Sequence, residues 1–239
     1  MPIKAILFDM FDTLIMINKE HAFYSPAVKS MHSFLFRNGI QVSFPSFRDA
    51  YIRARDALYD QADLKMEEPH FNVRIQNALQ ILGFNVEARS SLVQGATDAF
   101  CKEFINYVTL DPQTEETLRD LHRKYLIGLV SNFAIPECVQ RLLQQNDLRR
   151  HFDVIIVSAA VNKRKPNPDI YRCALEKLKV SPEETVFVGD TVDADVMGPK
   201  RVGIKTIYID RRPQKDLENH KPDHKIVELR ELPLVIQNL

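Results

Sequence analysis

The first fifteen residues constrain this chain more than any other stretch. Ala5–Phe8 is an apolar run of the length of a buried strand, and the carboxylate of Asp9 follows it directly. Apolar character returns at Leu14 and Ile15. Strands buried on both faces are typical of parallel sheets, and open α/β sheets bind ligands at the carboxyl ends of such strands. Asp9 is therefore a catalytic nucleophile if other polar residues reach the same edge, and a turn residue if they do not.

Strand and helix alternate along the second half of the chain. Further apolar runs of strand length lie at residues 125–130, 154–157, 185–188 and 205–209. Amphipathic segments separate or flank them, at residues 114–124, 136–145, 168–178 and 195–202. Continuous apolar strands that alternate with such helices are typical of a doubly wound parallel sheet. We therefore predict an α/β fold.

A long helical segment separates the first strand from its sheet. From about residue 25 to residue 107 apolar residues recur with helical spacing, and there is almost no strand signal. Helices are expected at about residues 25–38, 46–58, 72–82 and 88–107. Consecutive helices with short connections indicate a four-helix bundle. The predicted domains are a core of residues 1–17 and 108–239 and an inserted cap of residues 18–107, placed as a lid would be.

Polar side chains stand where several of the predicted strands end. In order along the chain, they are Asp9, Ser131 with Asn132, Lys165, and Asp190 with Asp195. One such residue says little, because helix N-caps prefer the same positions. Four clusters, each after its own strand, indicate a shared site. Arg164, beside Lys165, either adds to an anion site or is a solvated flank.

Three acidic side chains in one crevice need compensation. Two carboxylates about 4 Å apart repel each other by roughly 4 kcal/mol at an effective dielectric constant near 20. A cation with oxygen ligands relieves this, and Mg²⁺ suits such a set and also takes a substrate phosphate. Lys165 would neutralise the nucleophile or an incoming anion, and Ser131 would donate a hydrogen bond to a phosphoryl oxygen. The set predicts phosphoryl transfer with a carboxylate nucleophile.

These motifs resemble those of the haloacid dehalogenase superfamily of hydrolases. FDMFDTL is similar to the first motif of that family, with Asp9 as the nucleophile. Ser131 in LVSN and Lys165 in RKPNPDIY match the second and third motifs. GDTVDADVMGPKRVG resembles the fourth, with Asp190 and Asp195 as its acidic pair. All four occur in the order of the family, and the helical segment is similar to its four-helix cap.

The resemblance implies a Rossmann-like core and an aspartyl-enzyme intermediate. It implies that Asp9, Asp190 and the main-chain carbonyl of Phe11 hold Mg²⁺, with Asp195 supporting the metal. We also expect Thr13 to orient the nucleophile loop. The expected substrate-binding residues are Ser131, Asn132 and Lys165.

One position departs from the phosphatases that this chain resembles. Those enzymes have an Asp two residues after the nucleophile, which protonates the leaving group, and here that residue is Phe11. Loss of a general acid costs about 10²- to 10⁴-fold in rate. Asp12 should point elsewhere, because side chains alternate. An aromatic residue here is similar to the 2-haloacid dehalogenases, whereas Asp190 and Asp195 argue against a metal-free dehalogenase.

Three hypotheses follow. The first is a magnesium-dependent phosphatase-type hydrolase of a small phosphorylated molecule, slow with alkyl phosphates because of Phe11. The second is a carbon–halogen hydrolase of the 2-haloacid dehalogenase type, in which Asp9 attacks carbon. The third is a catalytically weak binding or regulatory module on the same fold.

Charge and cysteine content restrict the partners. Lys plus Arg and Asp plus Glu both number 32, and this balance argues against nucleic acid or an anionic membrane as the main partner. Cys101, Cys138 and Cys173 form no CxxC motif, which fits reduced thiols. There is neither a leader peptide pattern nor an apolar run of membrane-spanning length. We expect a cytoplasmic protein with a small anionic substrate, and the sequence leaves the oligomeric state open.

Overall fold

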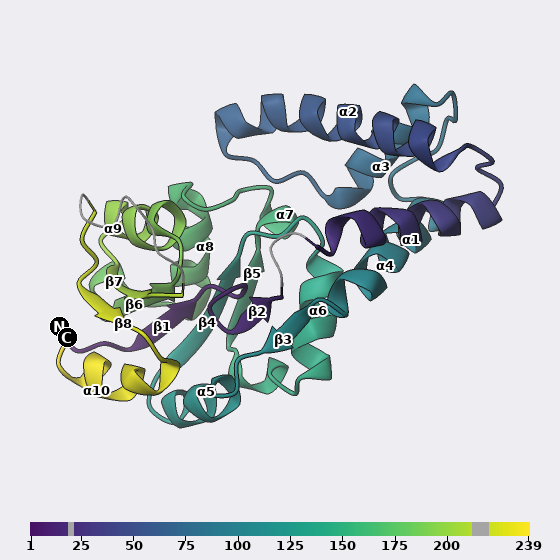
Figure 1. Ribbon diagram of the computed structural model, residues 1–239. Coiled ribbons are helices and arrows are strands. Elements are labelled where there is room, and N and C mark those ends of the chain that lie inside the picture. The colour runs from purple at the N-terminus through teal and green to yellow at the C-terminus, as the bar shows by residue number, and fades with distance from the viewer. Residues whose placement is uncertain (19–21, 212–219) are drawn as a thin grey trace.

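A six-stranded parallel sheet forms the centre of the molecule (Figure 1). The computed structural model describes residues 1–18, 22–211 and 220–239. The strands of the sheet, in their spatial order, are β5 (Val154–Val157), β4 (Leu126–Ser131), β1 (Ala5–Phe8), β6 (Thr185–Gly189), β7 (Lys205–Ile209) and β8 (His224–Ile226). Each neighbouring pair is parallel. The predicted α/β fold with a parallel sheet is thus confirmed.

Helices cover both faces of the sheet. They are α5 (Thr114–His122), α6 (Pro136–Gln145), α7 (Ser158–Val161), α8 (Pro168–Leu178), α9 (Gly198–Arg201) and α10 (Leu232–Gln237). Alternate residues of β1 enter two different cores: Ile6 and Phe8 pack with residues of α5, α6 and α10, and Ala5 and Leu7 pack with residues of α8. Burial on both faces is the reason that this strand is apolar throughout.

A helical insertion follows the first strand, as expected. Its helices are α1 (Tyr24–Arg37), α2 (Phe44–Ala62), α3 (Phe71–Ile81) and α4 (Ser91–Ile105), with a 3₁₀ turn, η1 (Asp63–Lys65), after α2. The side chains of Ser43 and Ser90 cap α2 and α4 by accepting amide hydrogen bonds. Helix α1 lies against α4, and α2 lies against α3 (Figure 1). Among the described residues, no helix has both the length and the apolar content needed to cross a membrane.

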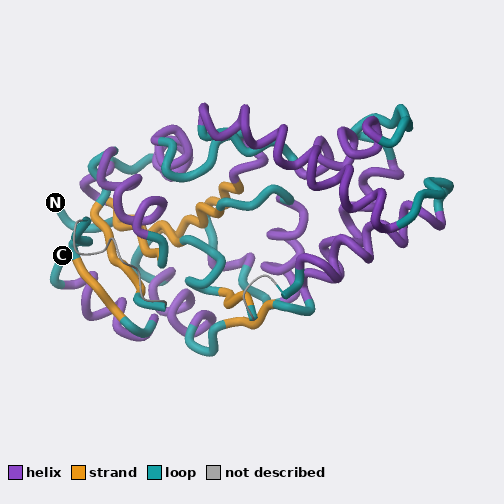
Figure 2. The backbone as a smooth tube through the Cα atoms, turned by 45° about the horizontal axis from the view of Figure 1, so that its top comes forward, coloured by secondary structure: helices purple, strands orange, loops and turns teal. Residues whose placement is uncertain are grey.

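Two short strands, which the sequence did not predict, connect the insertion to the sheet. They are β2 (Ile15–Ile17) and β3 (Val108–Leu110), and they pair antiparallel (Figure 2). Three residues each are too few to show a strand pattern. Beyond them the amide of Asn18 donates to the carbonyl oxygen of Tyr107 at 2.8 Å. Both crossings between insertion and sheet therefore lie side by side.

Gly128 tests how tightly the sheet is packed. A Cβ at this position of β4 would lie 2.6 Å from Cδ2 of Leu7 and 2.8 Å from Cγ1 of Val154. We predict that Gly128→Ala lowers the free energy of unfolding by about 1–3 kcal/mol, because overpacked interiors are strained. Urea denaturation measures this loss. Leu126→Ala on the same strand, where the side chain is 39% exposed, should cost only about 0.5 kcal/mol. Equal stability of Gly128→Ala and the parent chain would contradict the prediction.

Candidate active site

Neighbouring parallel strands bring the predicted polar residues to one edge of the sheet. Asp9 follows β1, Ser131 ends β4, and Asp190 follows β6, and β1 lies between β4 and β6. Lys165 lies in the loop after α7, and Asp195 lies in a helical turn after β6. All five side chains are buried, with 7% or less of each residue exposed.

The ammonium group of Lys165 joins two of the acids. Its Nζ donates to Oδ1 of Asp9 at 2.6 Å and to Oδ1 of Asp195 at 2.7 Å. The main chain of Lys165 is held by Asn132, whose Oδ1 accepts from the Lys165 amide at 2.8 Å and whose Nδ2 donates to the Lys165 carbonyl at 2.9 Å. Asn132, which the sequence suggested for substrate binding, therefore has a clear part in fixing Lys165.

The loop after β1 orients the carboxylate of Asp9. Thr13, which is fully buried, donates from its Oγ1 to Oδ2 of Asp9 at 3.3 Å. The amides of Leu14 and Ile15 both donate to the carbonyl oxygen of Met10, at 2.9 and 3.0 Å. This tight turn sets Thr13 beside Asp9.

Asp195 is reached through a wide helical turn instead of the regular helix expected to begin at that residue. Residues Val192–Met197 form a π-helix that leads into α9. The two carboxylate oxygens of Asp195 accept from Lys165 and from the amide of Thr191, the latter at 2.9 Å. Gly189 permits this close approach, since a Cβ there would overlap the Asp195 carboxylate. The structure thus ties Asp195 to Lys165.

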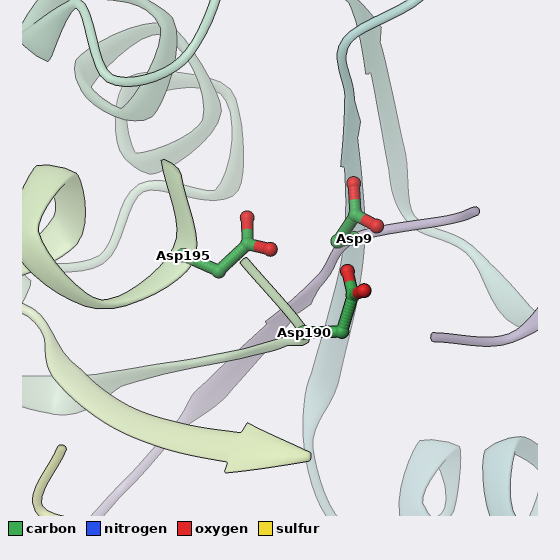
Figure 3. Close-up of side chains that lie close together, drawn as sticks. All are labelled: Asp9, Asp190 and Asp195. Carbon is green, nitrogen blue, oxygen red and sulfur yellow. The ribbon is translucent and has the colours of Figure 1, made fainter. Parts of the chain in front are cut away.

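The acids form a compact cluster. One oxygen each of Asp9, Asp190 and Asp195 lies within 4.8 Å of the others (Figure 3). Burial raises the pKa of Asp9 to about 6, with Lys165 opposing the rise and Asp195 adding to it. Burial and the charge of Asp9 raise the pKa of Asp190 to about 7. Burial alone would lower the pKa of Lys165, but Asp195 and Asp9 raise it. Three acids against one lysine leave an excess of negative charge.

This donor set fits Mg²⁺. The cation prefers carboxylate and carbonyl oxygens, and its charge offsets the burial and the mutual repulsion that raise the pKa values of Asp9 and Asp190. Asp9 and Asp190 are the side chains best suited to hold it, with the Phe11 carbonyl in the same loop as Asp9. Both carboxylate oxygens of Asp195 already accept hydrogen bonds, from Lys165 and from Thr191.

Ser131 has an unsatisfied hydroxyl. Its Oγ is buried and has no hydrogen-bond partner within the described ranges of the chain. Buried polar groups are nearly always paired, so such an exception calls for an explanation. A ligand oxygen that accepts from Ser131 would supply one.

Phe11, two residues after Asp9, belongs to an aromatic cluster. Its ring centroid lies 4.8 Å from that of Phe133 and 5.6 Å from that of Phe104 on α4. Phe104 also contacts Phe133 at 5.3 Å and Phe23 at 4.7 Å. The sequence analysis missed Phe133, although it stands two residues after Ser131 just as Phe11 stands two after Asp9. The cluster joins the edge of the sheet to the insertion.

Asp12 has a structural contact of its own. Its Oδ1 accepts a hydrogen bond from the amide of Ile17 at 3.0 Å, and its backbone is left-handed, with φ of 58°. Asp tolerates this conformation better than most residues. This geometry suits a turn residue that supports β2.

Comparisons with known proteins point to one family. A family model described as "Hydrolase: haloacid dehalogenase-like hydrolase" matches residues 3–203. The phosphoserine phosphatase of Thermus thermophilus is 32% identical over 136 residues, which are 56% of this chain and 54%, about half, of that protein. The glyceraldehyde 3-phosphate phosphatase of Methanopyrus kandleri is 27% identical over 242 residues, covering 99% of this chain and 98% of that protein.

A solved structure shows the same fold. The 2-haloacid dehalogenase of Pseudomonas syringae pv. Tomato has a TM-score of 0.75 at 22% identity, and the match covers 99% of both chains. Likeness at this identity extends to the fold alone. The relatives and this structure carry the names of two different chemistries on one architecture.

The acidic cluster makes a prediction about stability. A carboxyl whose pKa rises from 3.8 to about 7 on folding binds protons more tightly in the native state, so its contribution to stability falls as pH rises through that window. We predict that Asp190→Asn melts at a higher temperature than the parent chain in chelator, by a margin that grows from about pH 5 to pH 8. Mg²⁺ should raise the melting temperature of the parent at pH 8 and not that of the variant.

Asp193→Asn is the matched control, since Asp193 lies exposed on the π-helix that follows Asp190 in the chain. Its melting temperature relative to the parent should be nearly independent of pH and should respond to Mg²⁺ as the parent does. Parallel pH profiles for Asp190→Asn and the parent would show that Asp190 is not crowded by the other acids.

Proposed function

The chain belongs to the haloacid dehalogenase-like hydrolases, and from this premise we propose that it is a magnesium-dependent phosphatase of a small phosphorylated molecule. The observation that carries the proposal is the set of buried groups around Asp9. Lys165 bridges Asp9 to Asp195, and Ser131 presents a hydroxyl without a partner among the described residues. A relative matched along nearly its whole length is named a phosphatase, which supports the same chemistry.

Asp9 is the proposed nucleophile. Thr13 and Lys165 hold one oxygen each of its carboxylate, which orients it for attack on phosphorus. A bond forms between Asp9 and phosphorus as the bond to the leaving oxygen breaks, and water then cleaves the aspartyl phosphate to release inorganic phosphate. Ser131 and Lys165 donate hydrogen bonds to the phosphoryl oxygens. Mg²⁺, held by Asp9, Asp190 and the Phe11 carbonyl with support from Asp195, would supply positive charge against the phosphoryl group.

Phe11 restricts the leaving group. Phe11 stands at the sequence position that carries the proton donor in the phosphatases this chain resembles, and its ring packs against those of Phe104 and Phe133. We therefore propose that the substrates are aryl or acyl phosphates. Their leaving groups are activated and depart without full protonation. The apolar surroundings favour a leaving group of the same character.

The helical insertion is the proposed cap, with residues 18–107 closing over a core of residues 1–17 and 108–239. Asp9 is only 7% exposed, so a substrate enters only if the insertion moves. The chain passes between the two parts beside the paired strands β2 and β3, which are the proposed hinge.

Phe11 also favours the second candidate, a 2-haloacid dehalogenase, in which halide leaves without a proton. The cluster of acids argues against a dehalogenase. Attack on carbon does not need a metal, and without a metal nothing would offset the negative charge of Asp190. Halide release that survives chelator would select this chemistry. A binding module without activity is the third candidate, and it requires Asp9→Asn to leave all turnover unchanged.

The proposal predicts the outcome of a substrate screen. Phosphate release from aryl and acyl phosphates should occur with Mg²⁺ and stop in chelator, and 2-haloacids should release no halide. Asp9→Asn should reduce turnover to background, because the nucleophile is lost. Asp193→Asn, an exposed neutralisation on the same side of the core, should keep the activity of the parent. Chelator-resistant halide release, or activity of Asp9→Asn equal to the parent, would overturn the phosphatase assignment.

A second prediction concerns the missing acid. Phe11→Asp should speed the hydrolysis of alkyl phosphates by at least about 10-fold, part of the 10²- to 10⁴-fold that a general acid supplies. The aromatic neighbours would raise the pKa of the introduced carboxyl, so that it carries a proton near neutral pH. Aryl phosphates should gain less. Phe11→Leu, which opens space without an acid, should show no gain on alkyl phosphates, and an equal gain in both variants would count against our account of Phe11.

A further inference from the structure

Two segments far apart in the sequence meet beside Lys165. One is the turn after α2, residues 63–68, which we name the strip. The other is the loop of residues 163–167, which we name the lysine loop because it carries Lys165. In Figure 1 the C-terminal end of α2 overhangs the side of the core where α7 and α8 lie.

The contacts between the strip and the lysine loop are numerous and of complementary charge. The guanidinium group of Arg164 forms an ion pair with Asp63, and Nζ of Lys163 lies 3.3 Å from Oε1 of Glu67. The amide of Arg164 donates to the carbonyl oxygen of Met66 at 2.9 Å. The guanidinium also lies 5.7 Å from the ring centroid of Tyr59 on α2. Arg164 thus contacts the insertion through its main chain and its side chain.

The same stretch of main chain is held from two sides. The amide of Arg164 binds Met66 of the insertion, and the next amide, that of Lys165, binds Asn132 of the core. The side chain of Lys165 then reaches Asp9. If the insertion swings away to admit substrate, the contacts to the strip are lost while those to Asn132 and the acids remain.

We propose that Arg164 is a positioning residue that couples closure of the insertion to the alignment of Lys165 with Asp9. The inference rests on the proposed function, since Lys165 serves the reaction there. The Arg164 and Asp63 side chains are 25% and 56% exposed, and partly exposed ion pairs are weak and screened by salt. Such pairs suit a contact that forms and breaks in each turnover.

Kinetics with p-nitrophenyl phosphate test the coupling. Arg164→Ala and Asp63→Asn should each lower kcat by about 10- to 10²-fold, the effect of a small misalignment of a catalytic group, with a smaller change in KM. The double variant should be no worse than either single one. Arg164→Lys should recover part of the loss, and the exchanged pair Arg164→Asp with Asp63→Arg should recover more than either single reversal. Arg172→Ala is the matched control, because Arg172 pairs with Asp169 on the exposed side of α8, and its kcat should not change.

Hydrogen–deuterium exchange tests the contact without any substrate. In Asp63→Asn the peptide that contains the amides of Arg164 and Lys165 should exchange faster than in the parent, and added salt should speed the parent in the same direction. Arg172→Ala should exchange like the parent. If kcat falls in Arg164→Ala while the exchange of Asp63→Asn stays at the parental rate, Arg164 acts on the substrate and the proposal is wrong.

The two proposals fail in different ways. A parent chain with magnesium-dependent turnover, whose variants match it in both kcat and exchange, would overturn the role of Arg164 and leave the phosphatase intact. A parent without phosphatase activity, in which exchange still responds to Asp63→Asn, would overturn the proposed function while the strip is shown to hold the lysine loop.

Discussion

The site depends on the ion pairs that the buried ammonium group of Lys165 forms with Asp9 and Asp195. The group lies between Asp9 and Asp195 at 2.6 and 2.7 Å, and only 4% of the residue is exposed. A charge so far from water is stable only with partners, and removal of one partner leaves the other uncompensated. The surrounding elements serve this arrangement: Asn132 fixes the Lys165 main chain, and the π-helix and Gly189 bring Asp195 close.

The site combines buried polar side chains with a neighbouring aromatic cluster. Burial, together with the neighbouring acids, raises the carboxyl pKa values of Asp9 and Asp190, and the excess of acid over base among these groups favours a bound cation. The aromatic cluster of Phe11, Phe104 and Phe133 has no side chain that could donate a proton to a leaving group. In the function we propose, the polar groups act on the phosphoryl group and the aromatic rings restrict the leaving group, which reconciles two signals that conflict in the sequence.

The insertion contacts the sheet domain on both sides of that site. On the α6 side His70 lies 3.1 Å from Glu137, and the amide of Phe71 donates to the carbonyl oxygen of Ala134 at 2.9 Å. On the other side the strip meets the lysine loop. Most of these contacts are ion pairs or single hydrogen bonds with exposed partners, whereas the aromatic cluster between them is apolar.

The sequence by itself determined the sheet and the acidic edge. Burial on both faces requires unbroken apolar strands such as β1, and parallel strands share one carboxyl edge, so Asp9, Ser131 and Asp190 had to meet once the strands paired. The tertiary structure alone decided the rest. The strands β2 and β3 are too short to leave a pattern, and the parts taken by Asn132, Phe133 and Arg164 depend on partners brought together by folding. Arg164 and Asp63 are 101 residues apart in the chain, and no local periodicity encodes a contact over that distance.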